Sequence, residues 1–311
     1  MVFVFKKNIR KLNEIFAICY HSYKVFSKGY SDKLIALSVD ITNRCTLRCK
    51  HCYWWRQEHR YELSDAEWIS LIKRLKEQNP LILQAVWLGG EPLLRADLLE
   101  KLFSFFKFNS VLTNGTIPFP RWKNISFVVS VDGIEEDNDK IRGKGVYQRV
   151  RSNILKNRDL DLHLDCTLNK INFRNIDRFV EEWVETGIKG INFTFHTPQK
   201  GKKDEFTLLP KERDEALERI IALKDKYGSF IYGAKSQYKL MKSAICEKAT
   251  SWCRQHYPQM GLCLDSAGRP KVPCVFAGDV DCSDCGCPLP YILQAVRERD
   301  LEAIISLIRY R

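Results

Sequence analysis

The sequence predicts an α/β fold in the form of a partial (β/α)6 TIM-like barrel with a small cysteine-rich C-terminal extension. Two observations lead to this prediction. Apolar runs alternate with amphipathic segments from Leu34 onward, which is typical of βα units around a parallel sheet. Glycine-bearing or polar motifs follow several of these runs, where ligand-binding residues of such barrels gather. The predicted strands cover residues 34–42, 81–88, 109–113, 126–131, 161–167 and 190–195.

Composition sets the class of protein. The chain has 311 residues, of which 45% are hydrophobic, enough for one large domain and an appendage. Its net charge of +12 fits an anionic partner, which could be nucleic acid, a membrane surface or an acidic peptide. The start shows no secretory signal, so the twelve cysteines indicate cluster ligation in a reducing cytoplasm rather than disulfides. No apolar stretch approaches the roughly 18–20 residues that span a bilayer.

Residues 1–33 predict a basic amphipathic helix. Its apolar residues recur at three- and four-residue steps along one stripe: Phe5, Ile9, Leu12, Phe16, Cys19, Tyr23 and Phe26. Its basic residues outnumber Glu14 and Asp32; they are Lys6, Lys7, Arg10, Lys11, Lys24, Lys28 and Lys33. Two interpretations stay open. The helix could pack across the end of the barrel with its lysines solvated, or lie in the headgroup region of an anionic membrane.

Four local signals mark helix ends between the predicted strands. Ser64 and Glu67 form a capping box, and Asp97 is expected to cap the next helix. Gly187 is expected to end the helix over residues 176–183, and Gly228 the helix that begins at Pro210. We therefore divide the chain into an N-terminal helix (1–33), the barrel (34–228), an auxiliary region (229–290) and a C-terminal helix (291–311). One or two terminal helices could pack beside the first.

A short loop after the first strand carries three thiols at CxxxCxxC spacing, Cys45, Cys49 and Cys52. A [4Fe-4S] cluster otherwise takes four cysteines, so three thiolates would leave one iron open to a substrate or cofactor. Zinc is the alternative, although structural zinc sites are closed, four-coordinate and usually built from CxxC pairs.

Together with Gly89-Gly90-Glu91-Pro92 after the second strand, this loop resembles the radical S-adenosylmethionine (SAM) superfamily. The resemblance implies a barrel of the radical SAM type, in which a reduced cluster cleaves SAM to a 5'-deoxyadenosyl radical that abstracts a hydrogen atom from a carbon. It places His51 against the adenine and the turn of Gly89, Gly90, Glu91 and Pro92 at the methionyl amine. A one-electron reductant such as flavodoxin or ferredoxin would be the partner.

The resemblance also implies SAM contacts at later strand ends: Asn114, Ser130, Asp132, Thr167 and Asn169. Taken alone, the Ser130 to Gly133 segment would be an ordinary turn. Arg142 is a candidate carboxylate contact, with a solvated loop arginine as the alternative. No residue is assigned a catalytic role.

The tail holds a second group of thiols, with Cys246 in addition to the six candidate ligands Cys253, Cys263, Cys274, Cys282, Cys285 and Cys287. Residues 261–274 predict a small hairpin, and the whole resembles the SPASM or Twitch extension of radical SAM enzymes. The favoured ligands of one auxiliary cluster are Cys253, Cys274, Cys282 and Cys285, with Cys263 and Cys287 as competitors and a zinc knuckle as the alternative. Cys19 and Cys166 are expected to be buried free thiols.

Peptide or protein modification is the favoured function, because relatives with auxiliary clusters often act on such substrates. A membrane lipid is the main rival, on account of the basic first helix, and the protein is expected in the cytoplasm or peripherally at the inner face of the membrane. No RNA-binding module is recognisable, so a nucleic-acid partner is not favoured. A hypothesis of another class is a non-catalytic iron–sulfur electron carrier or a zinc-stabilised nucleic-acid binder.

Overall fold

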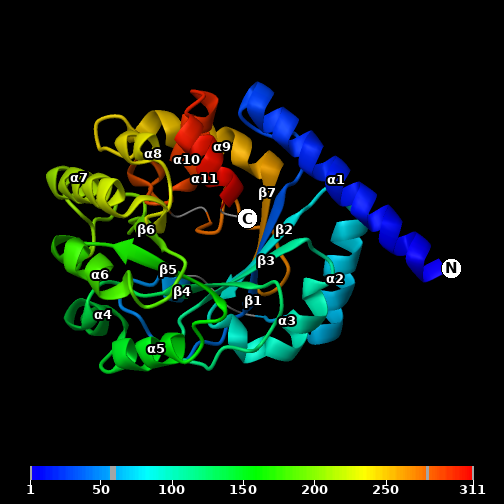
Figure 1. The fold of residues 1–311 in the computed structure, drawn as a ribbon, viewed down its shortest axis with the longest axis horizontal. Coiled ribbons are helices and arrows are strands. Elements are labelled where there is room, and N and C mark those ends of the chain that lie inside the picture. Colours follow the sequence, from blue (N-terminus) through cyan, green and yellow to red (C-terminus); the bar gives the residue numbers. More distant parts are fainter. Residues whose placement is uncertain (1, 57–60, 278–279, 310–311) are drawn as a thin grey trace.

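The computed structural model describes residues 2–56, 61–277 and 280–309, with the backbone alone for 2–11 and 307–309 (Figure 1). Its centre is one open, all-parallel sheet with the strand order β6-β5-β4-β3-β2-β1-β7. The strands are β1 (Ala36–Thr42), β2 (Gln84–Gly89), β3 (Phe108–Thr113), β4 (Ser126–Ser130), β5 (Asp161–Leu168), β6 (Ile191–Phe195) and β7 (Gly261–Leu264). The predicted α/β partial barrel is confirmed, and its six strands lie where the apolar runs placed them.

The seventh strand comes from the cysteine-rich extension. β7 pairs in parallel with β1, from Ala36 opposite Gly261 to Val39 opposite Leu264. The predicted hairpin is present beyond it, because Leu264 bridges Pro270 in antiparallel fashion. Its first arm therefore joins the main sheet rather than standing apart, and this bonds the extension to the strand that leads into the first cysteine loop.

Helices cover the outside of the sheet, and the chain ends in a helical group beside its β7 edge (Figure 1). The barrel helices are α2 (Asp65–Gln78), α3 (Ala96–Phe103), α4 (Glu135–Arg142), α5 (Val146–Leu155), α6 (Ile176–Trp183) and α7 (Pro210–Tyr227). The others are α1 (Val2–Lys28), α8 (Lys235–Leu240), α9 (Cys246–Met260), α10 (Leu289–Arg297) and α11 (Leu301–Arg309). Short 3-10 turns are η1 (Tyr53–Arg56), η2 (Pro92–Arg95), η3 (Phe173–Asn175), η4 (Gly228–Phe230) and η5 (Cys282–Asp284).

The two sides of the sheet differ in polarity. Along β5, Leu162, Leu164 and Cys166 are buried in the hydrophobic core that the outer helices complete. The alternate residues His163, Asp165 and Thr167 point to the opposite side and are only half-buried. β6 repeats this pattern, with Asn192 and Thr194 half-buried. The inner side of the barrel wall at β5 and β6 is thus polar and partly open to solvent.

The predicted helix ends are confirmed in part. Ser64 caps α2 in a full capping box, and α7 begins at Pro210 and ends before Gly228 at φ +57°. The expected cap at Asp97 is wrong, since α3 begins one residue earlier and Asp97 lies in its first turn. There its charge still suits the positive end of the helix dipole. α6 ends at Trp183, and Gly187 at φ +94° closes the turn that follows.

The first helix packs on the barrel with the face opposite to its apolar stripe. Ala17 and His21 are buried, whereas Leu12, Phe16, Tyr23 and Phe26 are exposed. Cys19 is also exposed, which corrects its expected burial, while Cys166 is buried as predicted. The stripe residues Phe5 and Ile9 lie outside the described side chains.

Two helices close the chain, and α10 packs beside the end of α1, where Arg297 lies against Gly29. This confirms the expected packing of first and last helices. Among the helices in the described ranges, none is long and apolar enough to cross a bilayer.

Candidate active site

The cysteine loop begins where β1 ends and reaches η1 without regular structure. All three of its thiols, on Cys45, Cys49 and Cys52, are half-buried and free. Burial raises the pKa of Cys49 to about 12 and also raises the pKa values of Cys45 and Cys52. The nearby thiol of Cys45 adds to the shifts of Cys49 and Cys52, and that of Cys52 adds to the shift of Cys49. The structure therefore gathers the three predicted cluster ligands into one small, poorly solvated region.

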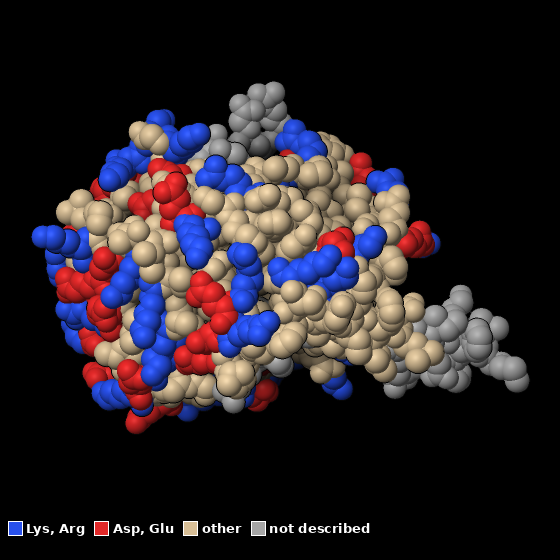
Figure 2. All heavy atoms as spheres, turned by 90° about the horizontal axis from the view of Figure 1, so that it is seen from above, with Lys and Arg blue, Asp and Glu red and all other residues tan. Residues whose placement is uncertain are grey.

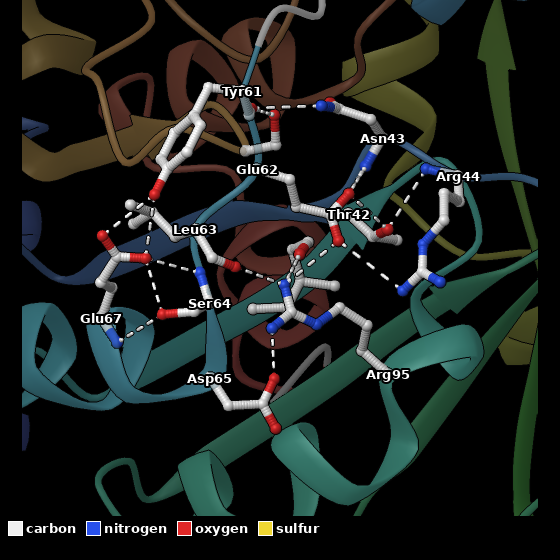
Figure 3. Close-up of polar contacts among 12 residues, drawn as sticks. Thr42, Asn43, Arg44, Tyr61, Glu62, Leu63, Ser64, Asp65, Glu67 and Arg95 are labelled. Atoms are coloured by element: carbon white, nitrogen blue, oxygen red, sulfur yellow. Dashed lines mark hydrogen bonds and ion pairs between the residues drawn. The ribbon is translucent and has the colours of Figure 1, made fainter.

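A network of polar side chains fixes the start of this loop (Figure 3). The carboxylate of Glu62 accepts hydrogen bonds from Thr42 Oγ1 at 2.9 Å and from the Asn43 amide at 2.8 Å. Arg95, whose side chain is 7% exposed, forms ion pairs with Glu62 and Asp65. Sequence analysis missed Glu62 and Arg95. Both lie outside the recognised motifs, and no local pattern joins residues thirty-three positions apart.

Arg95 also binds the main chain on two sides of the network. Its Nη1 donates to the carbonyl of Ile41 at 3.2 Å and to that of Leu63 at 2.8 Å. The last residues of β1 are thereby tied to the segment before α2. This holds the backbone from which the cysteine loop departs.

The Gly89 to Pro92 turn lies against the same loop. The amide of Gly90 donates to the Thr42 carbonyl at 2.9 Å, and the amide of Glu91 donates to the Arg44 carbonyl at 2.8 Å. A Cβ atom on Gly90 would lie 2.1 Å from the Arg44 oxygen. Only glycine permits this approach.

Glu91 is fully buried, and its carboxylate binds the end of β3. It accepts from Thr113 Oγ1 at 2.7 Å, from the Asn114 amide at 2.8 Å and from the Leu93 amide at 3.1 Å. Burial raises its pKa. Asn114 in turn places its Nδ2 3.6 Å from Cys45 Sγ and 2.9 Å from Thr46 Oγ1. The ends of β1, β2 and β3 are thus joined around the cysteine loop.

A buried group of charges follows β4. Asp132 Oδ2 lies 2.7 Å from Arg142 Nε and 3.1 Å from His51 Nε2, and Oδ1 accepts from the Thr167 amide at 2.9 Å. Burial acts to raise the pKa of Asp132, but the charge of Arg142 and the contact with His51 prevail and hold it well below its usual range. The sequence placed these residues in three separate motifs, and the fold brings them together.

Arg142 is the last residue of α4 and is buried, so the alternative of a solvated loop arginine is wrong. Burial acts to lower its pKa, but Asp132 and the thiols of Cys49 and Cys52 raise it well above the usual value. Those thiols are in turn favoured as thiolates by the guanidinium charge. Arg142 therefore couples the carboxylate of Asp132 to the cysteine loop.

The residues present fit the group that the cysteine loop resembles. Thiols suit an iron–sulfur cluster, which binds cysteine thiolates. Beside them, the buried His51 Nδ1 has no hydrogen-bond partner, and Asp132 Oδ2 and Arg142 Nε meet without hydrogen-bond geometry. Buried polar atoms left in this state are unusual in a finished core. Such atoms would be free to form hydrogen bonds with a polar ligand such as SAM.

The remaining candidate SAM contacts lie at the rim of β4 and β5. Ser130 ends β4 and is half-buried. Thr167 Oγ1 lies 3.1 Å from Thr194 Oγ1. Asn169 is fully buried, and its amide group bonds within its own loop, to the Ile171 amide at 2.9 Å and the Thr167 carbonyl at 3.1 Å. Asn169 therefore shapes the loop, and its SAM contact stays a prediction.

The inner side of the barrel holds a carboxyl group that sequence analysis missed. Asp165 accepts a hydrogen bond from Asn192 Nδ2 at 2.5 Å. Burial raises its pKa to about 6, and the neighbouring Asp132 adds to the shift. The alternation of polar and apolar residues along β5 was visible in the sequence and could have indicated this inward-facing acid.

The extension gathers its six candidate thiols between the two edges of the sheet: Cys263 lies in β7, and Gly286, between Cys285 and Cys287, accepts a hydrogen bond from the Phe195 amide at the end of β6. Burial raises the pKa of Cys253, and the nearby Cys285, Cys274 and Cys282 add to the shift. These are the four favoured ligands, and the fold brings them together. Cys285, Cys253 and Cys274 lie near Cys287 and add to the rise of its pKa. Cys263 lies close to Cys274 and 3.6 Å from Tyr257 Oη. Within the described ranges, no three His, Cys, Asp or Glu side chains are arranged as a single-ion metal site.

A buried salt bridge joins the extension to β1 of the barrel. Lys271 Nζ lies 2.5 Å from Asp40 Oδ2, and both side chains are buried.

A cavity of about 490 Å3 lies between the start of α7 and the extension, with Arg213, Cys246 and Ser283 in its wall. Arg213 is held there by Asp284 at 2.7 Å and by the Cys285 carbonyl at 2.8 Å. None of the candidate SAM contacts lines this cavity.

Comparison with known proteins shows which family and which solved structures this chain is similar to. The model of the Radical SAM superfamily matches residues 39–223. Fe-coproporphyrin III synthase of Methanosarcina barkeri is 34% identical over 194 residues, which cover 57% of this chain and 47% of that protein. The chain therefore spans about half the length of this curated relative.

Two solved structures share the fold. Native anSMEcpe with bound AdoMet and Cp18Cys peptide has a TM-score of 0.63 at 19% identity, covering 85% of this chain and 81% of that one. Streptococcus suis SuiB bound to the precursor peptide SuiA has a TM-score of 0.63 at 14% identity, covering 92% and 70%. The second match extends over nearly the whole chain.

Proposed function

Because the chain belongs to the radical SAM superfamily, whose enzymes use a [4Fe-4S] cluster and SAM, we propose that it abstracts a hydrogen atom from a carbon of a peptide or protein substrate. When bound, the cluster supplies the electron that breaks a carbon–sulfur bond of SAM and so yields a 5'-deoxyadenosyl radical. The chain's own residues bind, orient and shield the reactants.

Three roles follow for the residues around the loop. Cys45, Cys49 and Cys52 hold the cluster, and the positive charge of Arg142 beside Cys49 and Cys52 favours their thiolate forms. The turn at Gly90 sets the distance between loop and strand ends. Glu91 holds Asn114 beside Cys45, so these two residues position the ligands rather than react.

The substrate class rests chiefly on the inner face of β5 and β6. Thr167, Asn192 and Thr194 are half-buried there and offer hydroxyl and amide groups. Such groups match the alternating donors and acceptors of a peptide main chain. The two similar structures were solved with peptides, which supports this choice, although the curated relative is named for a porphyrin product.

The extension would serve the same reaction. We assign one auxiliary cluster to Cys253, Cys274, Cys282 and Cys285, with Cys263 and Cys287 as competing ligands. Because four thiolates leave no iron of such a cluster open, it would take the electron from a substrate radical rather than bind the substrate. The Lys271–Asp40 bridge fixes this region against the barrel. A flavodoxin or ferredoxin would supply the first electron.

A membrane lipid is a weaker candidate substrate. The exposed apolar face of α1 favours contact with a bilayer, but α1 lies at the amino ends of the strands. Its His21 binds the carbonyl of Leu81 before β2, and its Glu14 pairs with Lys107 before β3. The cysteine loop lies at the carboxyl end of the sheet, about 20 Å away along strands of six residues.

An anaerobic assay tests the substrate class. The reconstituted enzyme is given SAM and dithionite with either a pool of unstructured peptides or iron coproporphyrin III. We expect the peptide pool to raise the yield of 5'-deoxyadenosine several-fold and individual peptides to change mass by the loss of hydrogen. Stimulation by the porphyrin alone would contradict the peptide proposal.

A further inference from the structure

The first helix presents an apolar face to solvent. Its largest exposed side chains are Leu12 at 66%, Phe16 at 60%, Tyr23 at 69% and Phe26 at 71%, with Ile15 at 59%. At 100° per residue these positions fall on one stripe, opposite the buried Ala17 and His21. Soluble proteins rarely leave a continuous apolar stripe of this length uncovered, so something is expected to cover it.

The helix is held firmly by its other face. His21 is buried and forms hydrogen bonds through both ring nitrogens: Nε2 donates to the Leu81 carbonyl and Nδ1 pairs with Ser31 Oγ, each at 2.8 Å. Glu14 pairs with Lys107 at 3.1 Å. Because these contacts belong to the opposite side of the helix, the apolar stripe can be covered by a partner without any rearrangement of the barrel.

The first helix and the turn after it carry an excess of basic charge once internal ion pairs are counted. Glu14 is paired with Lys107, and Asp32 is paired with Lys24 at 2.6 Å and with the Tyr20 hydroxyl at 2.5 Å. Lys28 and Lys33 remain exposed. Four further basic residues occur in the sequence at positions 6, 7, 10 and 11, with no acidic residue among the first thirteen.

The surroundings of the helix continue this pattern. In Figure 2, charged side chains crowd the left of the molecule, while the right, toward the grey end of the chain, shows few of them. Figure 1 shows that α1 runs along this side and extends past α2. The exposed apolar stripe from Leu12 to Phe26 thus lies on a side of the molecule that carries few charged side chains.

From these contacts and charges we propose that α1 docks the enzyme on an anionic phospholipid membrane, with the stripe from Leu12 to Phe26 in the headgroup region. Helices that lie in this region combine an apolar face with Lys and Arg, and anionic lipid adds attraction for each basic residue. A second copy of the chain fits less well. Pairing two such helices would bring their basic residues together without acidic partners.

The docking leaves the site accessible. α1 contacts residues before β1, β2 and β3, and the cysteine loop follows the other end of β1. The mouth of the barrel therefore faces away from the membrane. The membrane holds the enzyme in place, and a water-soluble peptide can still enter, so this inference does not depend on the proposed substrate class.

Vesicle flotation of the full-length chain tests the proposal. The parent is expected to float with vesicles of equal parts phosphatidylglycerol and phosphatidylcholine, and to stay in solution with phosphatidylcholine alone. The double variant Phe16→Ser, Phe26→Ser should partition at least about tenfold less. Lys28→Gln with Lys33→Gln should weaken binding most at low salt.

A matched control removes two exposed apolar side chains elsewhere. Leu209 and Ile245 are 51% and 49% exposed, and the variant Leu209→Ser, Ile245→Ser should float like the parent. Equal flotation of the Phe16→Ser, Phe26→Ser variant would overturn the proposal, as would a parent that ignores anionic vesicles. A parent that forms a dimer which this variant dissociates would assign the stripe to a second copy instead.

Discussion

Arg142 is the residue on which the buried charges of the site depend. It pairs with Asp132 at 2.7 Å and lies beside the thiols of the cysteine loop. Its sequence context, a glycine-flanked basic segment, was equally consistent with solvent exposure. The end of α4 turns the side chain inward, and this contact between distant segments could not be read from local sequence.

Arg142→Gln should lower the free energy of unfolding by about 3–5 kcal/mol, because it leaves the carboxylate of Asp132 buried without its cation. Urea titration of the cluster-free protein measures this. Arg44→Gln is the control, since Arg44 is 65% exposed and lies 3.7 Å from Glu62, and it should cost less than about 1 kcal/mol. Equal effects of the two variants would show that Arg142 is not a buried charge partner.

Asp165 should make stability depend on pH. Burial raises its folded pKa to about 6, above the unfolded value, so its contribution is present below about pH 4 and lost as pH rises through about 6. Asp165→Asn has no carboxyl group at this position, so it should not lose folding stability as pH rises through about 6. Relative to the parent, the variant should gain about 2 kcal/mol between about pH 4 and pH 7 in urea titrations. A difference that does not change with pH would contradict the raised pKa.

At the scale of elements, the six strands of the barrel were predictable because each combines an apolar run with a polar or glycine-bearing end. Helix α1 was predictable as a helix, but not its orientation. Periodicity tells which residues share a face, whereas the contact of His21 with Ser31 and Leu81 decides which face is buried. The cap at Asp97 failed for a similar reason, since the 3-10 turn η2 runs directly into α3 and leaves no separate N-cap.

The Gly90 turn offers a test at this scale. Gly90→Ala places a Cβ atom 2.1 Å from the Arg44 carbonyl and must push the turn away from the cysteine loop. We expect iron per chain after reconstitution to fall toward that of a protein lacking the loop cluster. Gly201→Ala is the control, because a Cβ atom on Gly201 meets nothing within 4 Å. Since Gly201 has φ +72°, this variant should lose about 1–2 kcal/mol of stability through backbone strain. It should still bind as much iron as the parent. Full iron in Gly90→Ala would refute the close contact.

At the scale of the whole molecule, the link between extension and barrel was the least predictable feature. β7 has four residues and pairs with a strand more than two hundred positions earlier. The sequence around β7 predicts a local hairpin, and this hairpin is present. The local pattern gave no sign that β7 also pairs with β1. The Lys271–Asp40 bridge and the grouping of the six thiols follow from this pairing. Cysteine spacing alone could propose ligands, but only the folded chain shows that all six share one region.

The most direct test of the central claim is the formation of 5'-deoxyadenosine. Parent, Cys49→Ala and Cys19→Ala are reconstituted anaerobically with iron and sulfide, given SAM and dithionite, and assayed for product and for iron per chain. We predict product and about eight irons for the parent and for Cys19→Ala, whose thiol is exposed on α1, and no product and about four irons for Cys49→Ala. A fully loaded parent that forms no 5'-deoxyadenosine, or a Cys49→Ala variant as active as the parent, would contradict the assignment of this loop as the radical-generating site.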